Sequence, residues 1–531
     1  MIGTPWTLAL LAALRGGPGA GTAPPPRVQP AEPQLLVHIT VDQFRADYLD
    51  RWRSQLSGGL ARLLRDGAVF TAAFQDHAMT ETAPGHATVL SGRNPWSTGI
   101  VRNSEGVTDD NETGELLDVT GPGASPWRFR GTALFDWMQA RWPEARALSV
   151  SRKDRGAILP VGRARQLVYW YQGGQFTTSR YYADSLPAWV RAFNRAVPRA
   201  TAPGLTWNLL LDASAYAEPD SMDYEHGGRD YAFPHSLPPD REQAARAVVG
   251  MPWMDSLTLA LALEGAARLR LGAMGHPDLL AVSLSTTDAI GHAFGPDSRE
   301  IHDQVLRLDR YLGVFLDSLD RLVGGGRYVV SLTADHGVTP YPEYSSRHGH
   351  PEAQWVDPEG LIRADSETFA QQLGPHRWIR YFDLGLLVVD RPGLVSHGVA
   401  VDAFVHLVAA DLRRLPQVLR VDTPQSIAAA DTATDAVARR WRKTIPPDIH
   451  AELMVTLKPY MAWGDGVSAE HGQPSDDDTH VPLIIAGPGV AAGPYAGRVQ
   501  VADLAPTLAR LIGVAPLERL DGRALTEALT R

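Results

Sequence analysis

The sequence contains no cysteine among its 531 residues. Disulfide frameworks, cysteine-ligated zinc or iron–sulfur sites and thiol nucleophiles are therefore excluded. Basic residues are fewer than acidic ones: the sequence has 50 Lys and Arg and 60 Asp and Glu, which gives a formal net charge of −10. This balance argues against a nucleic-acid-binding protein. Beyond the N-terminus no stretch reaches the roughly 18 uninterrupted apolar residues that a membrane helix needs, so we expect no membrane span in the mature chain.

The first 30 residues differ in composition from the rest. A short apolar run at 5–14 is followed by a Gly-, Ala- and Pro-rich stretch up to Pro30. This pattern is typical of a secretory signal peptide with a cleavable spacer, although the usual positively charged segment before the apolar run is missing. We predict an exported protein, periplasmic or secreted; a mis-assigned start codon or a plain disordered tail is the alternative. Residues 31–531 are predicted to form one large domain with insertions at about 156–250 and 340–459.

Strand-like apolar runs alternate with longer helical patterns after residue 31, which is typical of an α/β fold. Five runs are predicted to be strands: 34–41, 145–151, 278–285, 328–333 and 481–485. We predict a mostly parallel central sheet with helices on both faces. Apolar residues at intervals of three or four between Ile301 and Leu322 predict a helix that packs on it. Ligands of such sheets bind beyond the carboxyl ends of the strands, where polar residues recur in this sequence.

An aromatic-rich segment, 167–182, lies within the first predicted insertion. It is predicted to form a hairpin that turns at Gly173 and Gly174. Its aromatic side chains either pack in a core or line a substrate mouth, and packing is the commoner fate of such clusters.

One carboxylate residue, Asp42, and one hydroxyl residue, Thr82, are candidate functional residues in the first part of the sequence. Asp42 ends the first predicted strand, where it is either a loop or cap residue or a metal ligand. Thr82 precedes Pro84 in the first turn of a predicted helix closed by Gly92. The exposed amides and dipole there favour an anion, which could be a phosphate or the threonine's own alkoxide; an ordinary N-cap threonine is the alternative.

Further carboxylates and imidazoles follow the later strands. Asp288 and His292 are four residues apart, so one helical turn places them on the same face, a workable geometry for one zinc ion. Asp335 and His336 end the fourth strand, and His471 precedes the last one. Together with Asp42 and Thr82, these groups suffice for two metal ions with oxygen and nitrogen ligands.

Taken in order, these motifs resemble the alkaline phosphatase superfamily, and within it the nucleotide pyrophosphatase/phosphodiesterase-like branch. The motifs are Val41-Asp42, Thr82-Ala83-Pro84-Gly85-His86, Asp288-Ala289-Ile290-Gly291-His292, Asp335-His336-Gly337 and His471-Gly472. The resemblance extends from about residue 35 to the closing segment 501–508. The pair Lys153 and Arg155, with the following residues 156–160, is similar to the bacterial phosphate-irrepressible alkaline phosphatases that use a threonine nucleophile.

The resemblance implies an alkaline phosphatase-like fold, two zinc ions per chain and Thr82 as nucleophile. One zinc ion would be held by Asp42, Thr82, Asp335 and His336, and the other by Asp288, His292 and His471. Asn103, 21 residues after Thr82, would donate to a phosphoryl oxygen, with a turn asparagine as the alternative. Lys153 and Arg155 would bind the phosphate, with a solvated basic pair as the alternative.

The predicted function is zinc-dependent hydrolysis of small phosphate monoesters through a phosphothreonine intermediate. A monoester carries about two negative charges near neutral pH and a diester one, so Lys153 and Arg155 favour the monoester. The first alternative is a phosphodiesterase or nucleotide pyrophosphatase with the same site, and the remote one is an inactive exported binding protein. No nucleic-acid partner is expected.

The remaining histidines and acidic residues receive supporting roles. His480 is the alternative to His471 as the seventh ligand, and we prefer His471 because His-Gly matches the branch. His86 is expected to support the site by hydrogen bonding. The triple acid Asp476–Asp478 is expected to form a solvated loop.

Overall fold

A computed structural model describes residues 32–196, 202–357, 360, 367–372 and 374–530. The predicted signal peptide and spacer, 1–30, lie outside these residues. In the described part of the chain, no helix has both the length and the apolar character that crossing a bilayer requires.

All five predicted strands are present and belong to one sheet. They are β1 (Leu35–Val41), β3 (Ala147–Ser151), β8 (Asp278–Leu284), β9 (Tyr328–Thr333) and β16 (His480–Ala486). The others are β2 (Gly67–Phe74), β4 (Leu167–Gln172), β5 (Gln175–Thr177), β17 (Gly493–Tyr495) and β18 (Val499–Gln500). The order is β17-β2-β16-β9-β1-β8-β3-β4-β5, with β18 beside β2. The four pairings from β9 to β4 are parallel, which confirms the mostly parallel sheet.

One central strand runs against its neighbours, with a consequence for the site. β16 is antiparallel to both β9 and β2. Its register pairs Leu483 with Thr333, the last residue of β9. The start of β16 therefore lies at the edge where the parallel strands end, and the segment that carries His471 arrives there too.

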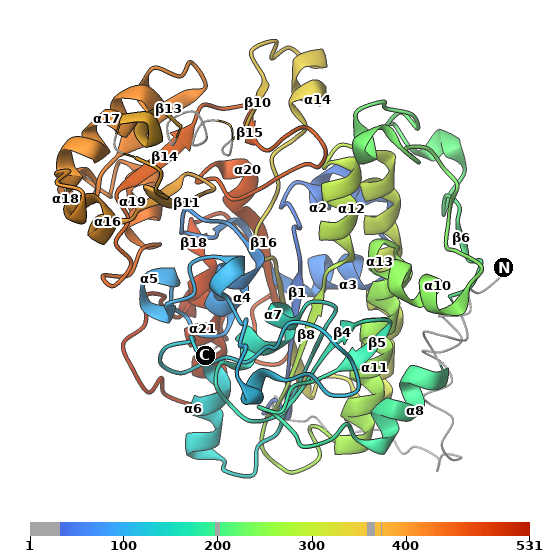
Figure 1. Cartoon of the computed structure of the whole chain (residues 1–531). Coiled ribbons are helices and arrows are strands. Elements are labelled where there is room, and N and C mark those ends of the chain that lie inside the picture. Colours follow the sequence, from blue (N-terminus) through green and yellow to red (C-terminus); the bar gives the residue numbers. More distant parts are fainter. Residues whose placement is uncertain (1–31, 197–201, 358–359, 361–366, 373, 531) are drawn as a thin grey trace, which may run out of the picture.

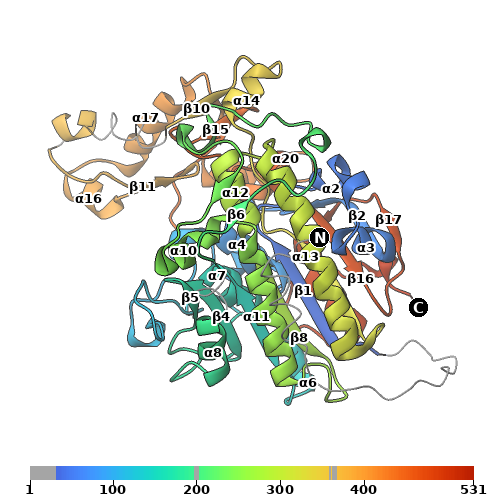
Figure 2. The ribbon, with the colours of Figure 1, turned by 90° about the vertical axis from the view of Figure 1, so that its right-hand side faces the viewer.

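Helices cover both faces of the sheet, as predicted (Figures 1 and 2). One face carries α3 (Gly59–Asp66), α11 (Trp253–Leu269) and α13 (Arg299–Leu319). The other carries α4 (Thr82–Val89), α6 (Leu134–Arg141), α7 (Asp154–Ile158) and α21 (Leu504–Ile512). α13 is the helix predicted between Ile301 and Leu322, and its apolar stripe is buried. β1 and β8 are buried along their whole length, because both of their faces are covered.

The predicted hairpin is β4 and β5, which pair antiparallel across Gly173 and Gly174. Both glycines have positive φ, 59° and 89°, as a tight two-residue turn requires. Tyr169, Trp170 and Phe176 are buried in the main core, so the aromatic residues pack rather than line a mouth. β4 also pairs with β3 and extends the central sheet.

A second, smaller core lies above the sheet edge in the orange part of Figure 1. Its four-stranded antiparallel sheet has the order β11-β12-β14-β13. The strands are β11 (Ile379–Asp383), β12 (Leu386–Val389), β13 (Val418–Asp422) and β14 (Leu453–Leu457). Around them lie α16 (Arg391–Ser396), α17 (Val401–Arg413), α18 (Pro424–Ala429) and α19 (Ala436–Arg442). Trp378, Phe404 and Leu453 are centred in this core.

The remaining elements connect these parts. The short strands are β6 (Thr206–Trp207), β7 (His235–Ser236), β10 (Gln354–Val356) and β15 (Met461–Trp463). The helices are α2 (Tyr48–Arg51), α5 (Pro95–Thr98), α8 (Ala188–Ala196), α10 (Arg241–Ala247), α12 (Thr286–Phe294), α14 (Pro342–Arg347) and α20 (Asp476–Thr479).

Candidate active site

The predicted site residues converge beyond the carboxyl ends of β1, β3, β8 and β9. Asp42 directly follows β1, and Asp335 and His336 follow β9. Asp288 and His292 lie on α12, which begins two residues after β8, and Lys153 lies between β3 and α7. Asp42, Asp335 and His336 are fully buried, whereas the His292 side chain is 28% exposed.

Thr82 is the first residue of α4 and is itself buried. Glu81, in an extended conformation, precedes the helix, so Thr82 begins its first turn. Gly85 lets this helix lie against the segment after β9 that carries Asp335. A Cβ at Gly85 would come within 2.3 Å of the Asp335 carbonyl oxygen and 2.6 Å of its Cβ. The glycine thereby brings the threonine hydroxyl close to the carboxylates.

The three predicted histidine ligands share one hydrogen-bonding pattern. Each Nδ1 lies beside a backbone carbonyl: Gly337 for His336 at 2.9 Å, Thr80 for His471 at 2.6 Å and Ala469 for His292 at 2.6 Å. A carbonyl oxygen only accepts, so Nδ1 carries the proton and the Nε2 lone pair remains for a ligand. This second contact is the usual means of orienting a metal-binding imidazole.

The protonation of these imidazoles also suits metal binding. Burial lowers the pKa of His336 and holds that of His471 well below its usual range, so both rings are neutral near pH 7. For His292, burial is outweighed by the Asp288 carboxylate, which raises the pKa. A metal ion at His292 must therefore compete with a proton.

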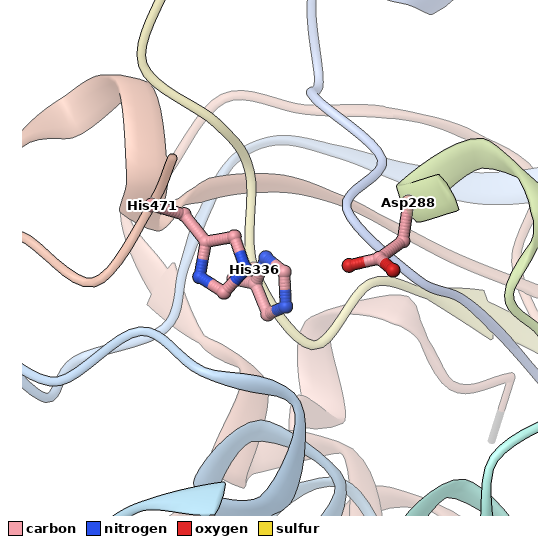
Figure 3. Close-up of side chains that lie close together, drawn as sticks. All are labelled: Asp288, His336 and His471. Carbon is pink, nitrogen blue, oxygen red and sulfur yellow. The ribbon is translucent and has the colours of Figure 1, made fainter. Parts of the chain in front are cut away.

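Three potential metal clusters occur in the described residues. Their ligand atoms lie within 4.8 Å of one another in each of the sets Asp42/Asp335/His336, Asp288/His336/His471 and His292/Glu470/His471. The His336 and His471 rings stack with centroids 3.8 Å apart, and the Asp288 carboxylate faces them (Figure 3). Asp42, Asp335 and His336 of the first predicted set form one cluster. The second predicted set is divided between the other two clusters, which also contain His336 and Glu470.

The arrangement of these donor atoms favours a bound cation. Asp42 Oδ1 and His336 Nε2 lie 3.5 Å apart, and both are buried without a hydrogen-bond partner among the described residues. A carboxylate oxygen facing an imidazole lone pair is unfavourable unless a positive charge lies between them. The three carboxylates Asp42, Asp288 and Asp335 gather around one buried ammonium, Lys153, so a bound cation would relieve the repulsion among them.

Lys153 is the centre of this charge network. Its Nζ lies 2.8 Å from Asp42 Oδ2, 2.7 Å from Asp288 Oδ2 and 3.0 Å from Thr82 Oγ1. Burial opposes ionisation of Asp288, but the Lys153 charge holds its pKa well below the usual range. Burial, and then the charges of Asp288 and Asp335, raise the pKa of Asp42 well above it. Lys153 is only 8% exposed, which contradicts a solvated basic pair.

Asn103 and Arg155 interact with the residues that flank Thr82. The Asn103 Oδ1 accepts from the Ala83 amide at 2.8 Å, and the Asn103 amide donates to Glu81 Oε2 at 3.0 Å. Because its oxygen is engaged, the side chain offers its Nδ2 donors to a ligand. The charge of Arg155 acts on the buried Glu81 next to Thr82.

Two carboxylates have supporting roles that the sequence did not predict. Asp255, on α11, accepts from the Thr286 amide at 3.1 Å and its hydroxyl at 2.7 Å, and so caps α12 from another helix. A carboxylate in the apolar first half of that helix was the signal available. Asp478 accepts from the Gln473 amide and the Thr339 hydroxyl, both at 2.8 Å, and braces the loop after His471.

Asp478 therefore corrects the expectation of a solvated loop. Asp476–Thr479 form the short helix α20, and Asp478 is fully buried. His480 lies away from the metal clusters: its Nε2 donates to the Thr71 carbonyl at 3.0 Å and its ring stacks on Phe74. His86 has both nitrogens in hydrogen bonds, to the Thr82 carbonyl and the Ser283 hydroxyl, as expected of a supporting residue.

Comparison with known families agrees with this geometry. Residues 36–473 match the family model of type I phosphodiesterases and nucleotide pyrophosphatases. The chain belongs to this family. It is thus an enzyme of the alkaline phosphatase superfamily, and the resemblance seen in the sequence motifs is confirmed.

Two relatives of this family member cover nearly all of its length. The alkaline phosphatase PhoK of Sphingomonas is 31% identical over 93% of this chain and 91% of its own. The alkaline phosphatase PafA of Elizabethkingia meningoseptica is 29% identical over 94% of this chain and 95% of its own.

The crystal structure of PafA superposes with a TM-score of 0.86 over 96% of this chain and 100% of that one, at 27% identity. A PafA variant with one threonine, one asparagine, one lysine and one arginine substituted gives a TM-score of 0.87. The α/β fold predicted for this chain is confirmed by these superpositions.

Proposed function

We propose that this enzyme hydrolyses phosphate monoesters through a phosphothreonine intermediate on Thr82, with two bound zinc ions. The observation that carries the proposal is the placement of the Thr82 hydroxyl among three buried carboxylates, three Nε2 lone pairs and one ammonium. Asp42, Thr82, Asp335 and His336 would hold one zinc ion, and Asp288, His292 and His471 the other. When bound, the ions supply Lewis acidity that lowers the pKa of a hydroxyl and stabilises a leaving oxygen.

The chain's own groups account for the remaining chemistry. The Thr82 oxygen attacks phosphorus, the ester oxygen leaves with the electron pair of the broken bond, and water then releases phosphate and restores the threonine. Lys153 lies 3.0 Å from Thr82 Oγ1, so its charge favours the alkoxide. Asn103 and Arg155 would supply hydrogen-bond donors to the equatorial oxygens of the phosphoryl group.

A relative supports the residue assignment. In the PafA variant, the substituted threonine and asparagine are 21 residues apart and the lysine and arginine two apart. Thr82 and Asn103, and Lys153 and Arg155, have the same spacings.

The preference for monoesters rests on Lys153 and Arg155, because two cations stabilise a bound dianion more than a bound monoanion. The family name also covers diesterases, which makes a phosphodiesterase with the same site the second candidate.

Turnover of p-nitrophenyl phosphate by a Thr82→Ala variant tests the proposal. We expect loss of at least about 10³-fold in kcat and no acid-stable phosphoprotein, because the nucleophile is gone. Thr88→Ala is the matched control, since this threonine of the same helix donates to the Pro84 carbonyl at 2.9 Å. Near-normal turnover by Thr82→Ala would refute the assignment of Thr82 as nucleophile.

Comparison with bis(p-nitrophenyl) phosphate separates a monoesterase from a diesterase, because Lys153→Ala should reduce kcat/KM for the monoester more than for the diester.

We also propose that residues 1–30 are a signal peptide and spacer that direct export. The supporting feature is the apolar run at 5–14 followed by a Pro- and Gly-rich stretch. N-terminal sequencing of the mature protein in a cell fraction tests this: a chain that retains Met1 in the cytoplasm would overturn it.

A further inference from the structure

A second cavity, of about 290 Å³, lies against the segment that carries Lys153 and Arg155. Its walls come from three parts of the chain: the start of α7, the turn between β4 and β5, and helix α10. The residues that matter here are Arg152, Lys153, Arg155, Gln172, Gly174 and Arg246.

The cavity has an excess of positive charge. Among the residues the structure describes, Arg152 and Arg246 have no carboxylate oxygen within 4.0 Å. The one carboxylate in the wall, Asp154, is 3.5 Å from the Arg155 guanidinium. The charge of Arg152 acts on Asp255, but the carboxylate oxygens of Asp255 already accept hydrogen bonds from Thr286 and Gln304. Three guanidinium groups therefore share a single carboxylate.

The arginines also have unsatisfied donors. The Nε atoms of Arg152 and Arg155 are buried and donate to no described group. A buried, unpaired guanidinium donor is costly, and an anion that accepts from it removes the cost. Tyr171, the aromatic residue of the wall, donates its hydroxyl to the Ala245 carbonyl at 2.6 Å. The cavity therefore suits a small anion better than an apolar group.

Lys153 joins this cavity to the catalytic site. Lys153 is one of the residues that line the cavity, and its Nζ lies 3.0 Å from the Thr82 hydroxyl. An anionic group in the cavity and a phosphoryl group at Thr82 would therefore both lie close to this residue. A single flexible substrate could occupy both places.

We propose that this cavity is a subsite for a second phosphate on the substrate, so that the enzyme favours organic bisphosphates over monophosphates. The substrate assignment rests on the proposed phosphomonoesterase function. A phosphate is the preferred occupant because its dianion and several acceptor oxygens match guanidinium donors from different directions. Gln172 and Gly174 complete the wall beside the arginines.

The test compares butane-1,4-diol bisphosphate with butyl phosphate, measured as kcat/KM at one ionic strength. We expect the wild-type enzyme to prefer the bisphosphate by about tenfold. Arg246→Gln should reduce this ratio by about threefold to fivefold, Arg246→Glu should remove it, and Arg246→Lys should keep most of it. Arg246 is exposed on α10, so these variants should fold. Arg163→Gln, an exposed arginine outside the cavity wall, is the control for the change in net charge and should leave the ratio as it is.

The outcomes separate the subsite from the proposed function. If both substrates are hydrolysed and Arg246→Glu leaves the ratio unchanged, the subsite does not exist. If neither substrate is hydrolysed by the zinc-loaded wild-type enzyme, the proposed function fails. Calorimetric titration with butane-1,4-bisphosphonate then decides the subsite alone: weaker binding to Arg246→Glu than to Arg163→Gln supports it, and equal binding overturns it.

Discussion

The proposed metal-ligand cluster has two halves that are built in different ways. The inner half consists of Asp42, Asp335 and His336, which directly follow the adjacent strands β1 and β9 and are fully buried. The outer half consists of Asp288, His292 and His471, which lie on helix α12 and on the loop before α20. The inner residues inherit their positions from a hydrogen-bonded sheet, whereas the outer ones depend on packing and side-chain contacts.

The contacts of the outer half come from distant parts of the chain. Asp255 caps the helix that carries Asp288 and His292. The loop that carries His471 is held by Thr80, whose carbonyl accepts from His471 Nδ1 and whose hydroxyl accepts from the Gly472 amide at 3.1 Å. Residues with the same proposed role, metal binding, can therefore be held in place by different kinds of contact. We expect the outer half to be the more accessible and the more easily weakened.

The largest expected effect contrasts one histidine from each half. His336→Ala and His292→Ala should each lower kcat by about 10³-fold or more, because each removes a proposed metal ligand. Added imidazole should restore part of the activity of His292→Ala, whose side chain is 28% exposed, and none of that of His336→Ala, whose side chain is fully buried. Titration of both variants with imidazole measures this, with the wild-type enzyme as control. Equal rescue of the two variants would contradict the difference in accessibility.

A smaller effect is expected when the support of the outer half is altered. Asp255 accepts three hydrogen bonds, the third from Gln304 at 2.8 Å, and an asparagine has only one acceptor oxygen. Asp255→Asn should therefore loosen α12 and weaken metal binding by about tenfold, as changes to groups that orient ligands do. Zinc occupancy measured against a competing chelator reports this.

The chain offers a matched control for Asp255. Asp309 on α13 caps α3 in the same way, since its Oδ1 accepts from the amides of Leu60 at 2.8 Å and Ala61 at 3.1 Å. Asp309→Asn should destabilise the fold without a selective loss of zinc. If the two variants lose zinc equally, Asp255 acts through general stability and not through α12.

The same contrast explains what the sequence could reveal. Asp42, Asp335 and His336 were predictable because apolar strand patterns end at them, and the ends of parallel strands meet at one edge. Asp288 and His292 were recognisable from their spacing on one helix. Asp255 was not, because its role exists only once α11 packs beside α12. The burial of Asp478 was missed for the same reason: its partners Thr339 and Gln473 meet it through loops whose paths no periodicity defines.

The smallest effect on catalysis is expected from the ion pairs that connect the central sheet to the second core. Asp76, just after β2, lies 2.6 Å from Lys443 and 3.2 Å from Arg439, both at the end of α19. Burial opposes ionisation, but Lys443 and then Arg439 lower the pKa of Asp76 to about 2. A lowered pKa stabilises the folded state above the ordinary aspartate pKa of about 3.9, and this stability is lost as the pH falls through 2.

Replacing Asp76 by asparagine should therefore lower stability by about 2 kcal/mol at pH 5 and leave turnover at neutral pH nearly unchanged. Unfolding of the metal-free protein by denaturant measures the difference, and metal-free protein removes the pH dependence of zinc binding from the comparison. The gap between wild type and Asp76→Asn should narrow from pH 5 toward pH 2, because protonation removes the same charge that the substitution removes. A gap that stays constant over this range would show that Asp76 stabilises the junction by shape and not by charge.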